Sequence, residues 1–107
     1  MAKPAVPMAK PAAPLLRTAI IQRGREETAR FSQALRNLDA RGLRTPCSDD
    51  QISYLWLSEL FNERRQATKW CRSCPVIVEC RTAAVARREK WFVFGGIDFT
   101  KNPKARS

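Results

Sequence analysis

Four cysteines and no histidine, in a chain of 107 residues, constrain this protein more than any other feature of its sequence. The cysteines are Cys47, Cys71, Cys74 and Cys80, which gives the spacing Cys-x23-Cys-x2-Cys-x5-Cys. Two cysteines three positions apart at a helix end or turn can reach the same metal centre, and this is the common chelating pair. We therefore expect a metal site with these four thiolates as its ligands.

The spacing favours an iron–sulfur cluster over a single zinc ion. A zinc ribbon normally has a second CxxC pair, and here a distant cysteine and a five-residue step replace it. A cubane cluster is larger than one ion, so it accepts ligands spread over more than one helical turn and one from a remote loop. Zinc stays open as the alternative metal, as do four buried cysteines without any metal.

The absence of histidine also narrows the function. It excludes a Ser–His or Cys–His nucleophilic pair, an imidazole general base and a Cys/His zinc finger. The acidic residues are scattered, and no pair has a spacing typical of glycosidases or proteases. We therefore expect that the protein is not an enzyme.

The charge distribution suggests the class of partner. Residues 1–46 carry 9 Lys or Arg against 3 acids, and residues 61–107 carry 11 against 4, which makes both flanks of the cysteine loop basic. A basic excess of this size favours polyanions, with nucleic acid first, although a solvated basic surface explains the charge equally well.

No segment of the sequence is expected to enter a membrane. The longest uncharged apolar stretches are too short to span a bilayer, and three arginines interrupt the N-terminal apolar residues where a signal peptide would need an unbroken core. We therefore expect a cytoplasmic protein, and in a reducing cytoplasm four thiols indicate metal more often than disulfide bonds.

The hydrophobic pattern predicts an all-α fold with helices gathered around the cysteines. Residues 1–14 consist of two copies of a Pro/Ala/Lys unit, so we expect a disordered arm there. Residues 15–46 predict a basic helical extension in which Gly42 ends the helix. The extension is either one continuous helix or two shorter helices separated at Gly24. Residues 47–99 are expected to form the cluster-binding domain, and residues 100–107 a short basic tail.

Three further helices are predicted within the cysteine domain. The first covers about residues 50–61 and is apolar nearly all round, so it is either buried or offers one side to a partner. The second starts with Asn62 as its N-cap and carries Cys71 and Cys74 on one face. Pro75 is suited to the first position of the third, which ends near residues 88–90. Gly95 and Gly96 then predict a tight turn with positive φ.

These features, in this order, resemble the WhiB-like (Wbl) proteins of actinobacteria and their phages. The resemblance rests on a loop cysteine, the block Cys71-x2-Cys74-Pro75 with Cys80 six positions after Cys74, and a downstream turn, F-V-F-G-G at residues 92–96, which resembles the family form G-V/I-W-G-G. It covers about residues 47–98.

The resemblance implies a [4Fe–4S] cluster held by the four cysteines and sensitive to oxygen and nitric oxide. It also implies a transcription regulator that binds the C-terminal region of the primary sigma factor. The family's contact with that factor maps onto Phe94, Gly95 and Gly96, and by their position near the cluster Trp56 and Trp70 are further candidates.

Two departures from the family pattern change these expectations. Phe94 stands where the family turn has tryptophan, so an indole N–H donor is lost. The basic tail that touches DNA in many members is reduced here to Lys101, Lys104 and Arg106, our candidates for nucleic-acid binding. The basic N-terminal half is a second candidate surface, and phosphate contacts alone would give it affinity without sequence choice.

Two other functions stay open. One is a zinc-stapled protein-interaction module without a redox role. The other is a thiol–disulfide oxidoreductase of the apo form, using Cys71 and Cys74, although the βαβ setting typical of such enzymes is missing. If the cluster is lost, we expect a disulfide between Cys71 and Cys74 first and between Cys47 and Cys80 second.

Overall fold

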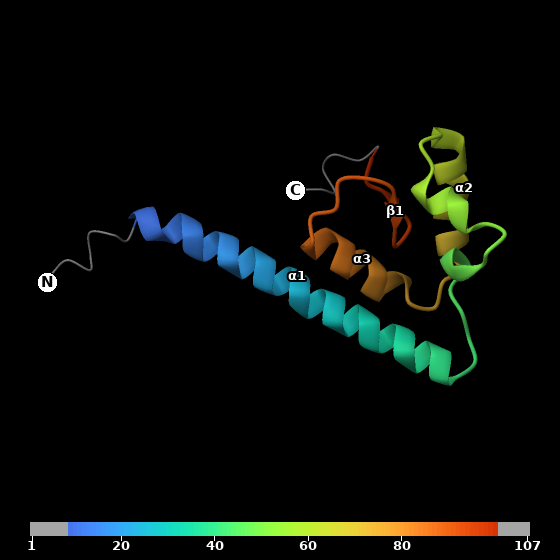
Figure 1. The fold of residues 1–107 in the computed structure, drawn as a ribbon, viewed down its shortest axis with the longest axis horizontal. Helices are drawn as coiled ribbons and strands as arrows, with labels where there is room; N and C mark the ends of the chain where they lie inside the picture. Colours follow the sequence, from blue (N-terminus) through green and yellow to red (C-terminus); the bar gives the residue numbers. More distant parts are fainter. Residues whose placement is uncertain (1–8, 101–107) are drawn as a thin grey trace, which may run out of the picture.

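One long helix and a group of shorter elements make up the fold, as a computed structural model of the chain shows (Figure 1). The structure describes residues 9–100, with side chains from residue 17 onward. The elements in chain order are α1 (Ala9–Ala40), the 3₁₀ turns η2 (Pro46–Ser48) and η3 (Ser53–Leu57), α2 (Phe61–Cys71), α3 (Ile77–Ala86), β1 (Val93–Phe94) and β2 (Ile97–Asp98). The fold is mostly helical, as expected. A two-stranded antiparallel hairpin, which the all-α prediction omitted, follows the last helix.

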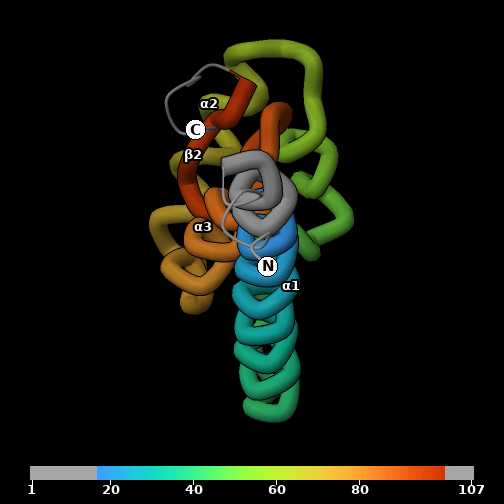
Figure 2. Tube along the Cα trace, turned by 90° about the vertical axis from the view of Figure 1, so that its left-hand side faces the viewer, coloured from blue at the N-terminus to red at the C-terminus, as the bar shows by residue number. Residues whose placement is uncertain are grey.

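The helix α1 is a single continuous helix that lies along α3 (Figures 1 and 2). It begins at Ala9, within the segment predicted as the arm, and residues 1–8 lie outside the described part. Gly24 does not divide the helix. Instead it is buried against α3, where a Cβ atom would lie 3.3 Å from the carbonyl oxygen of Ala86.

The C-terminal end of α1 agrees with the prediction. Gly42 adopts a φ of +73°, and its N–H donates to the carbonyl of Asp39 at 2.9 Å. The N–H of Leu43 donates to the carbonyl of Leu38 at 3.1 Å. These two bonds form a Schellman cap, which satisfies the last carbonyl groups of the helix, so the predicted role of Gly42 is confirmed.

The predicted helix over residues 50–61 is wrong. The chain there forms turns and η3, which is five residues long. The physical reason lies in Asp49, whose carboxylate accepts from the N–H of Gln51 at 2.9 Å and whose carbonyl accepts from Ile52 and Ser53. Aspartate that bonds to its own neighbouring backbone offers the chain a turn in place of a helix.

Both later helices begin at other residues than we expected. The N-cap of α2 is Leu60 and not Asn62, and no side chain caps the helix; just before it, Oγ of Ser58 accepts from the N–H of Leu60 at 3.0 Å and donates to Glu63. Pro75 lies in a turn before α3, which begins at Ile77. Cys74 therefore lies in the connection between two helices and not on the face of α2.

The helix α3 ends earlier than expected, at Ala86, because Arg88 takes a left-handed conformation with a φ of +59°. The hairpin then pairs Val93 with Asp98 and Phe94 with Ile97. Its turn consists of Gly95 and Gly96, with φ of +58° and +81°, so the predicted positive-φ turn is confirmed.

The core lies where η3, α2 and β1 meet. It contains Leu55, Trp56, Ala67, Cys71 and Val93. A buried ion pair extends it, because Arg64 of α2 donates through Nε to both carboxylate oxygens of Asp98, at 3.1 and 3.0 Å. This pair ties the second strand of the hairpin to the helix that ends in Cys71.

Candidate metal centre

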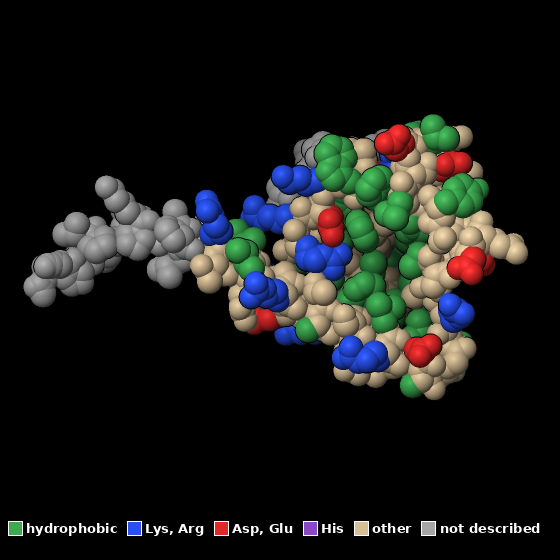
Figure 3. Space-filling view, viewed as in Figure 1, with side chains coloured by type: hydrophobic (Ala, Val, Ile, Leu, Met, Phe, Trp, Pro, Cys, Tyr) green, Lys and Arg blue, Asp and Glu red, His purple; other side chains and the backbone are tan. Residues whose placement is uncertain are grey.

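All four cysteines line one cavity of about 530 Å³. They reach it from different segments: Cys47 from η2, Cys71 from the last residue of α2, Cys74 from the connection and Cys80 from α3. Hydrophobic side chains gather around a hollow on this face of the molecule, between α1 and the segments near α2 (Figure 3). Thus cysteines separated by up to 33 residues share one hollow.

The remaining wall of this cysteine cavity is mostly apolar. It includes two side chains of α1, Phe31 and Leu35, which lie far upstream of the first cysteine. The other apolar lining residues are Pro46, Tyr54, Trp56, Leu57, Val76, Ile77, Val93, Phe94 and Gly95. The sequence analysis did not connect Phe31 and Leu35 with the cysteines, because nothing local in the sequence shows where this side of the helix packs.

Hydrogen-bond donors surround the sulfur atoms. The indole Nε1 of Trp56 donates to Sγ of Cys71 at 3.3 Å, and Oγ1 of Thr45 lies 3.2 Å from Sγ of Cys47. The backbone N–H groups of Gly96, Val76 and Gly95 also act on Cys71, Cys74 and Cys80 respectively, because each lowers the thiol pKa of its cysteine. Each sulfur therefore has at least one polar neighbour in an otherwise apolar wall.

Burial makes the free thiolates unfavourable. Desolvation raises the pKa of Cys71 and Cys74 above its ordinary value, and it raises the pKa of Cys80 to about 11. The hydrogen bonds named above act in the opposite direction, and the charge of Arg81 also lowers the pKa of Cys71. Without a bound cation these three thiols are protonated at neutral pH, so metal binding would release protons.

The donor set and the cavity bear on the kind of metal that the four cysteines would hold. Within residues 17–100, no three histidine, cysteine, aspartate or glutamate side chains come together closely enough to hold one metal ion. The four sulfurs nevertheless share a cavity. An all-sulfur donor set around a space wider than one ion requires fits an iron–sulfur cluster better than zinc.

The glycine turn packs directly on α3 beside the cysteines. A Cβ atom on Gly95 would lie 2.4 Å from Cα of Arg81, and Nε of Arg81 donates to the Gly95 carbonyl at 2.8 Å. The guanidinium of Arg87 lies 5.7 Å from the centre of the Phe94 ring, and its Nη1 donates to Thr28 of α1 at 3.2 Å. The turn is thus held between α3 and α1, and Gly95 is buried.

The candidate partner residues are placed differently from one another. Trp56 is 7% exposed and bonds to Cys71, whereas Trp70 is 46% exposed and does not line the cysteine cavity. Phe94 and Gly96 are half-buried. Lys101, Lys104 and Arg106 lie outside the described residues.

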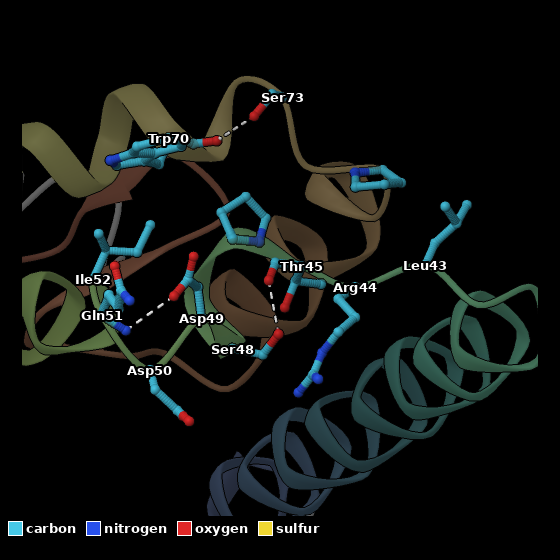
Figure 4. Close-up of a pocket in the computed structure, with 12 residues that line it drawn as sticks. Leu43, Arg44, Thr45, Ser48, Asp49, Asp50, Gln51, Ile52, Trp70 and Ser73 are labelled. Atoms are coloured by element: carbon cyan, nitrogen blue, oxygen red, sulfur yellow. Dashed lines mark hydrogen bonds between the residues drawn. The ribbon is translucent and has the colours of Figure 1, made fainter.

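Trp70 borders a second hollow, of about 620 Å³, whose other lining residues come mostly from the loop on either side of Cys47 (Figure 4). Hydrogen bonds fix this loop: Oγ of Ser48 donates to the carbonyl of Thr45 at 2.7 Å, and the N–H of Gln51 donates to Asp49. Polar and charged side chains of the loop line the hollow, so it lacks the apolar character of the cysteine cavity.

An exposed apolar surface adjoins the cysteine cavity. Tyr54 and Leu57 line the cavity and are 59% and 62% exposed, and Leu60 and Phe61, which follow along the chain, are also exposed but do not line it. The segment from Asp50 to Phe61 thus has two kinds of apolar side chain: Leu55 and Trp56 are buried in the core, whereas neighbouring apolar side chains are exposed. Exposed apolar residues in such a group are typical of a protein-interaction site.

Comparison with known proteins adds the family. The family model described as "Transcription factor WhiB" matches residues 40–106, which is more than half of the chain. The transcriptional regulator WhiB7 of Mycolicibacterium smegmatis is 43% identical over 42 residues, which cover 39% of this chain and 41% of that protein. The chain thus spans less than half the length of this relative. No solved structure matches the chain. Among the described helices, none is long and apolar enough to cross a membrane.

Proposed function

The chain belongs to the WhiB family of transcription factors, and from this premise we propose that it regulates transcription through a [4Fe–4S] cluster bound to its four cysteines. The observation that carries the proposal is the shared cavity: Cys47, Cys71, Cys74 and Cys80 arrive from four segments and line the same apolar hollow.

The residues around the cavity suit a cluster. Four thiolates would hold it, and the N–H groups of Gly95, Gly96 and Val76 would offset the negative charge on their sulfurs. When bound, the cluster supplies a centre that reacts with oxidants and nitric oxide. Phe31 and Leu35 of α1 cover part of the cavity wall and would limit the access of water to it.

The proposed partner is the C-terminal region of the primary sigma factor. The surface that fits a protein partner is the exposed apolar pair that lines the cavity, Tyr54 and Leu57, and the exposed Leu60 and Phe61 follow it along the chain. Phe94 and Gly96 of the turn lie next to the cavity and are half-buried, so they can contribute at its edge. A partner seated here would contact the surroundings of the cluster, so that gain or loss of the cluster changes its binding.

The basic surface supports a position near promoter DNA in the cytoplasm. The exposed arginines of α1 include Arg23 and Arg30, which are seven positions apart and therefore lie on one side of the helix, and the exposed Arg41 follows directly after its end. Contacts of these side chains with phosphate groups would add affinity without sequence choice.

The thiol chemistry speaks against the oxidoreductase alternative. A catalytic CxxC cysteine needs a lowered thiol pKa, because the thiolate is the nucleophile. Burial instead raises the pKa of both Cys71 and Cys74. A non-enzymatic role fits these thiols better.

Anaerobic co-expression with the C-terminal region of the primary sigma factor tests the proposed docking. We expect the two proteins to co-purify, and we expect Leu57→Glu to abolish this while the brown colour of the cluster is kept. Val78→Glu is the matched control, because Val78 is 65% exposed on α3 and does not line the cavity. If the wild-type chain carries its cluster but retains no sigma factor, the docking proposal is wrong.

A further inference from the structure

Trp56 makes a contact that a partner-binding tryptophan would not need. Its indole Nε1 donates to Sγ of Cys71 at 3.3 Å, and the two residues are 7% and 6% exposed. The bond joins η3 to the last residue of α2 across 15 positions of the chain. A side chain this buried offers almost no surface to another protein, so the sequence-based assignment of Trp56 to partner binding does not account for its position.

The indole N–H has a physical reason to bond to this sulfur. A buried N–H donor without a partner is costly, so buried tryptophans nearly always find an acceptor. Cys71 provides one, and its sulfur also lines the cysteine cavity. The other N–H donors to Cys71, Cys74 and Cys80 are backbone amides of Val76, Gly95 and Gly96, which substitution cannot remove without moving the chain.

We propose that Trp56 is a positioning residue for the cluster: its N–H···S bond fixes the orientation of the Cys71 ligand and raises the reduction potential of the bound cluster. This inference rests on the proposed [4Fe–4S] cluster. One-electron reduction adds a negative charge that is shared with the cysteine sulfurs, and an N–H dipole aimed at one of them stabilises the reduced form more than the oxidised form. Loss of the N–H group therefore shifts the potential to a lower value.

The sign of the shift separates this role from simple packing. Trp56 also packs in the core with Leu55, Ala67 and Val93, so a smaller side chain loosens the wall of the cavity. Greater access of water stabilises the more highly charged, reduced form and raises the potential. Loss of the hydrogen bond and loss of packing thus move the potential in opposite directions.

The test compares the wild-type protein with Trp56→Phe and Trp91→Phe, each purified without air and titrated with a chemical reductant. Trp91 is the control because it is 59% exposed and does not line the cavity. We expect a lower potential for Trp56→Phe, read from the absorbance and the electron paramagnetic resonance of the reduced cluster, and an unchanged potential for Trp91→Phe. A potential for Trp56→Phe equal to or above the wild-type value would overturn the proposal.

A second measurement decides the matter if Trp56→Phe does not retain a cluster. In wild-type protein labelled with ¹⁵N at the indole nitrogens, we expect the Trp56 N–H to exchange with solvent far more slowly than the Trp91 N–H. Equally fast exchange at the two sites would show that the bond to Cys71 does not exist. The iron content of the same wild-type sample separates the two proposals, because a sample without iron refutes the cluster and a sample with iron but fast exchange refutes only the role of Trp56.

Discussion

The buried ion pair between Arg64 and Asp98 should be the most sensitive polar contact outside the cysteine cavity. The side chains of Arg64 and Asp98 are 9% and 6% exposed, Nε of Arg64 donates to both carboxylate oxygens, and its Nη1 donates to the carbonyl of Ser58 at 3.2 Å. The same carboxylate accepts from the N–H of Thr100 at 3.1 Å. The pair thereby fixes the hairpin, and with it the glycine turn, against α2.

Asp98→Asn keeps the shape of the side chain and leaves the charge of Arg64 buried without its counter-ion. Removing one partner of a buried pair costs about 3–5 kcal/mol. A domain of this size loses about 4–8 °C of thermal midpoint per kcal/mol, so we expect a fall of at least roughly 12 °C. Since cluster loss makes unfolding irreversible, all variants are compared at one heating rate, with circular dichroism and cluster absorbance recorded together.

Two further variants complete this test. Arg65→Ala is the control: its side chain is exposed on the same helix, and a surface substitution of this kind changes stability by about 0.5 kcal/mol or less. Replacing both Arg64 and Asp98 with apolar residues should recover much of the loss, because no buried charge then remains uncompensated. A loss of 1 kcal/mol lowers the thermal midpoint by at least about 4 °C. An Asp98→Asn midpoint within about 4 °C of the Arg65→Ala midpoint would therefore refute the reasoning.

Three other substitutions or conditions test separate parts of the structure. Gly95→Ala should prevent stable folding, because the new Cβ would overlap the backbone of Arg81 at 2.4 Å. Gly42→Ala is the control: its new Cβ would meet nothing within 4 Å, so only the φ of +73° is unfavourable, and the free energy of unfolding in chemical denaturation should fall by about 1–2 kcal/mol. Equal effects of the two substitutions would contradict this placement of the turn. Phe31→Ala should lower the free energy of unfolding by less than the roughly 3–5 kcal/mol lost with a fully buried phenylalanine. It should also speed the decay of cluster absorbance in air, because it opens the part of the cavity wall that α1 contributes. An unchanged decay would mean that α1 does not shield the site. Cluster assembly on the apo protein should become more favourable as the pH rises from 7 toward 9. Burial raises the pKa of the Cys80 thiol to about 11, so this thiol must release its proton when the cluster binds. An assembly yield independent of pH would contradict this.

The parts of the fold that the sequence predicted correctly depend on strong local signals. Gly42 can occupy the left-handed position that ends α1, and Gly95 with Gly96 can form a turn of two positive-φ residues, so both were recognisable from residue type alone. The hairpin itself was missed because each strand has two residues, which is too short for an alternating pattern to appear.

The errors concern competing local choices and long-range packing. Asn62 is of a type that can cap a helix, but α2 already begins at Phe61 after Leu60, where the hydroxyl of Ser58 bonds to both Leu60 and Glu63. The turn at Asp49 replaced a predicted helix for a similar local reason. That Phe31 lines the same cavity as the cysteines follows from the packing of α1 on α3, which no periodicity within α1 specifies.

The candidate site shows the same division between local and long-range information. The ligand types and the CxxC spacing drew attention to the four cysteines, and the structure brings them to one cavity. The hydrogen bond from Trp56 to Cys71 was not foreseeable, because it depends on the chain between them forming η3 and a turn in place of a helix. The role of the cysteines as cluster ligands stays a prediction.

The most direct test of that central claim is an absorption spectrum, with iron and sulfide analysis, of protein purified without air. We predict a brown sample with a broad band near 400 nm, about four irons and four sulfides per chain. A Cys80→Ser variant should lose most of both, because one ligand of the cavity is then an alcohol. A colourless wild-type sample with one zinc per chain would contradict the account, since it would leave a four-cysteine site without the cluster on which the proposed regulation depends.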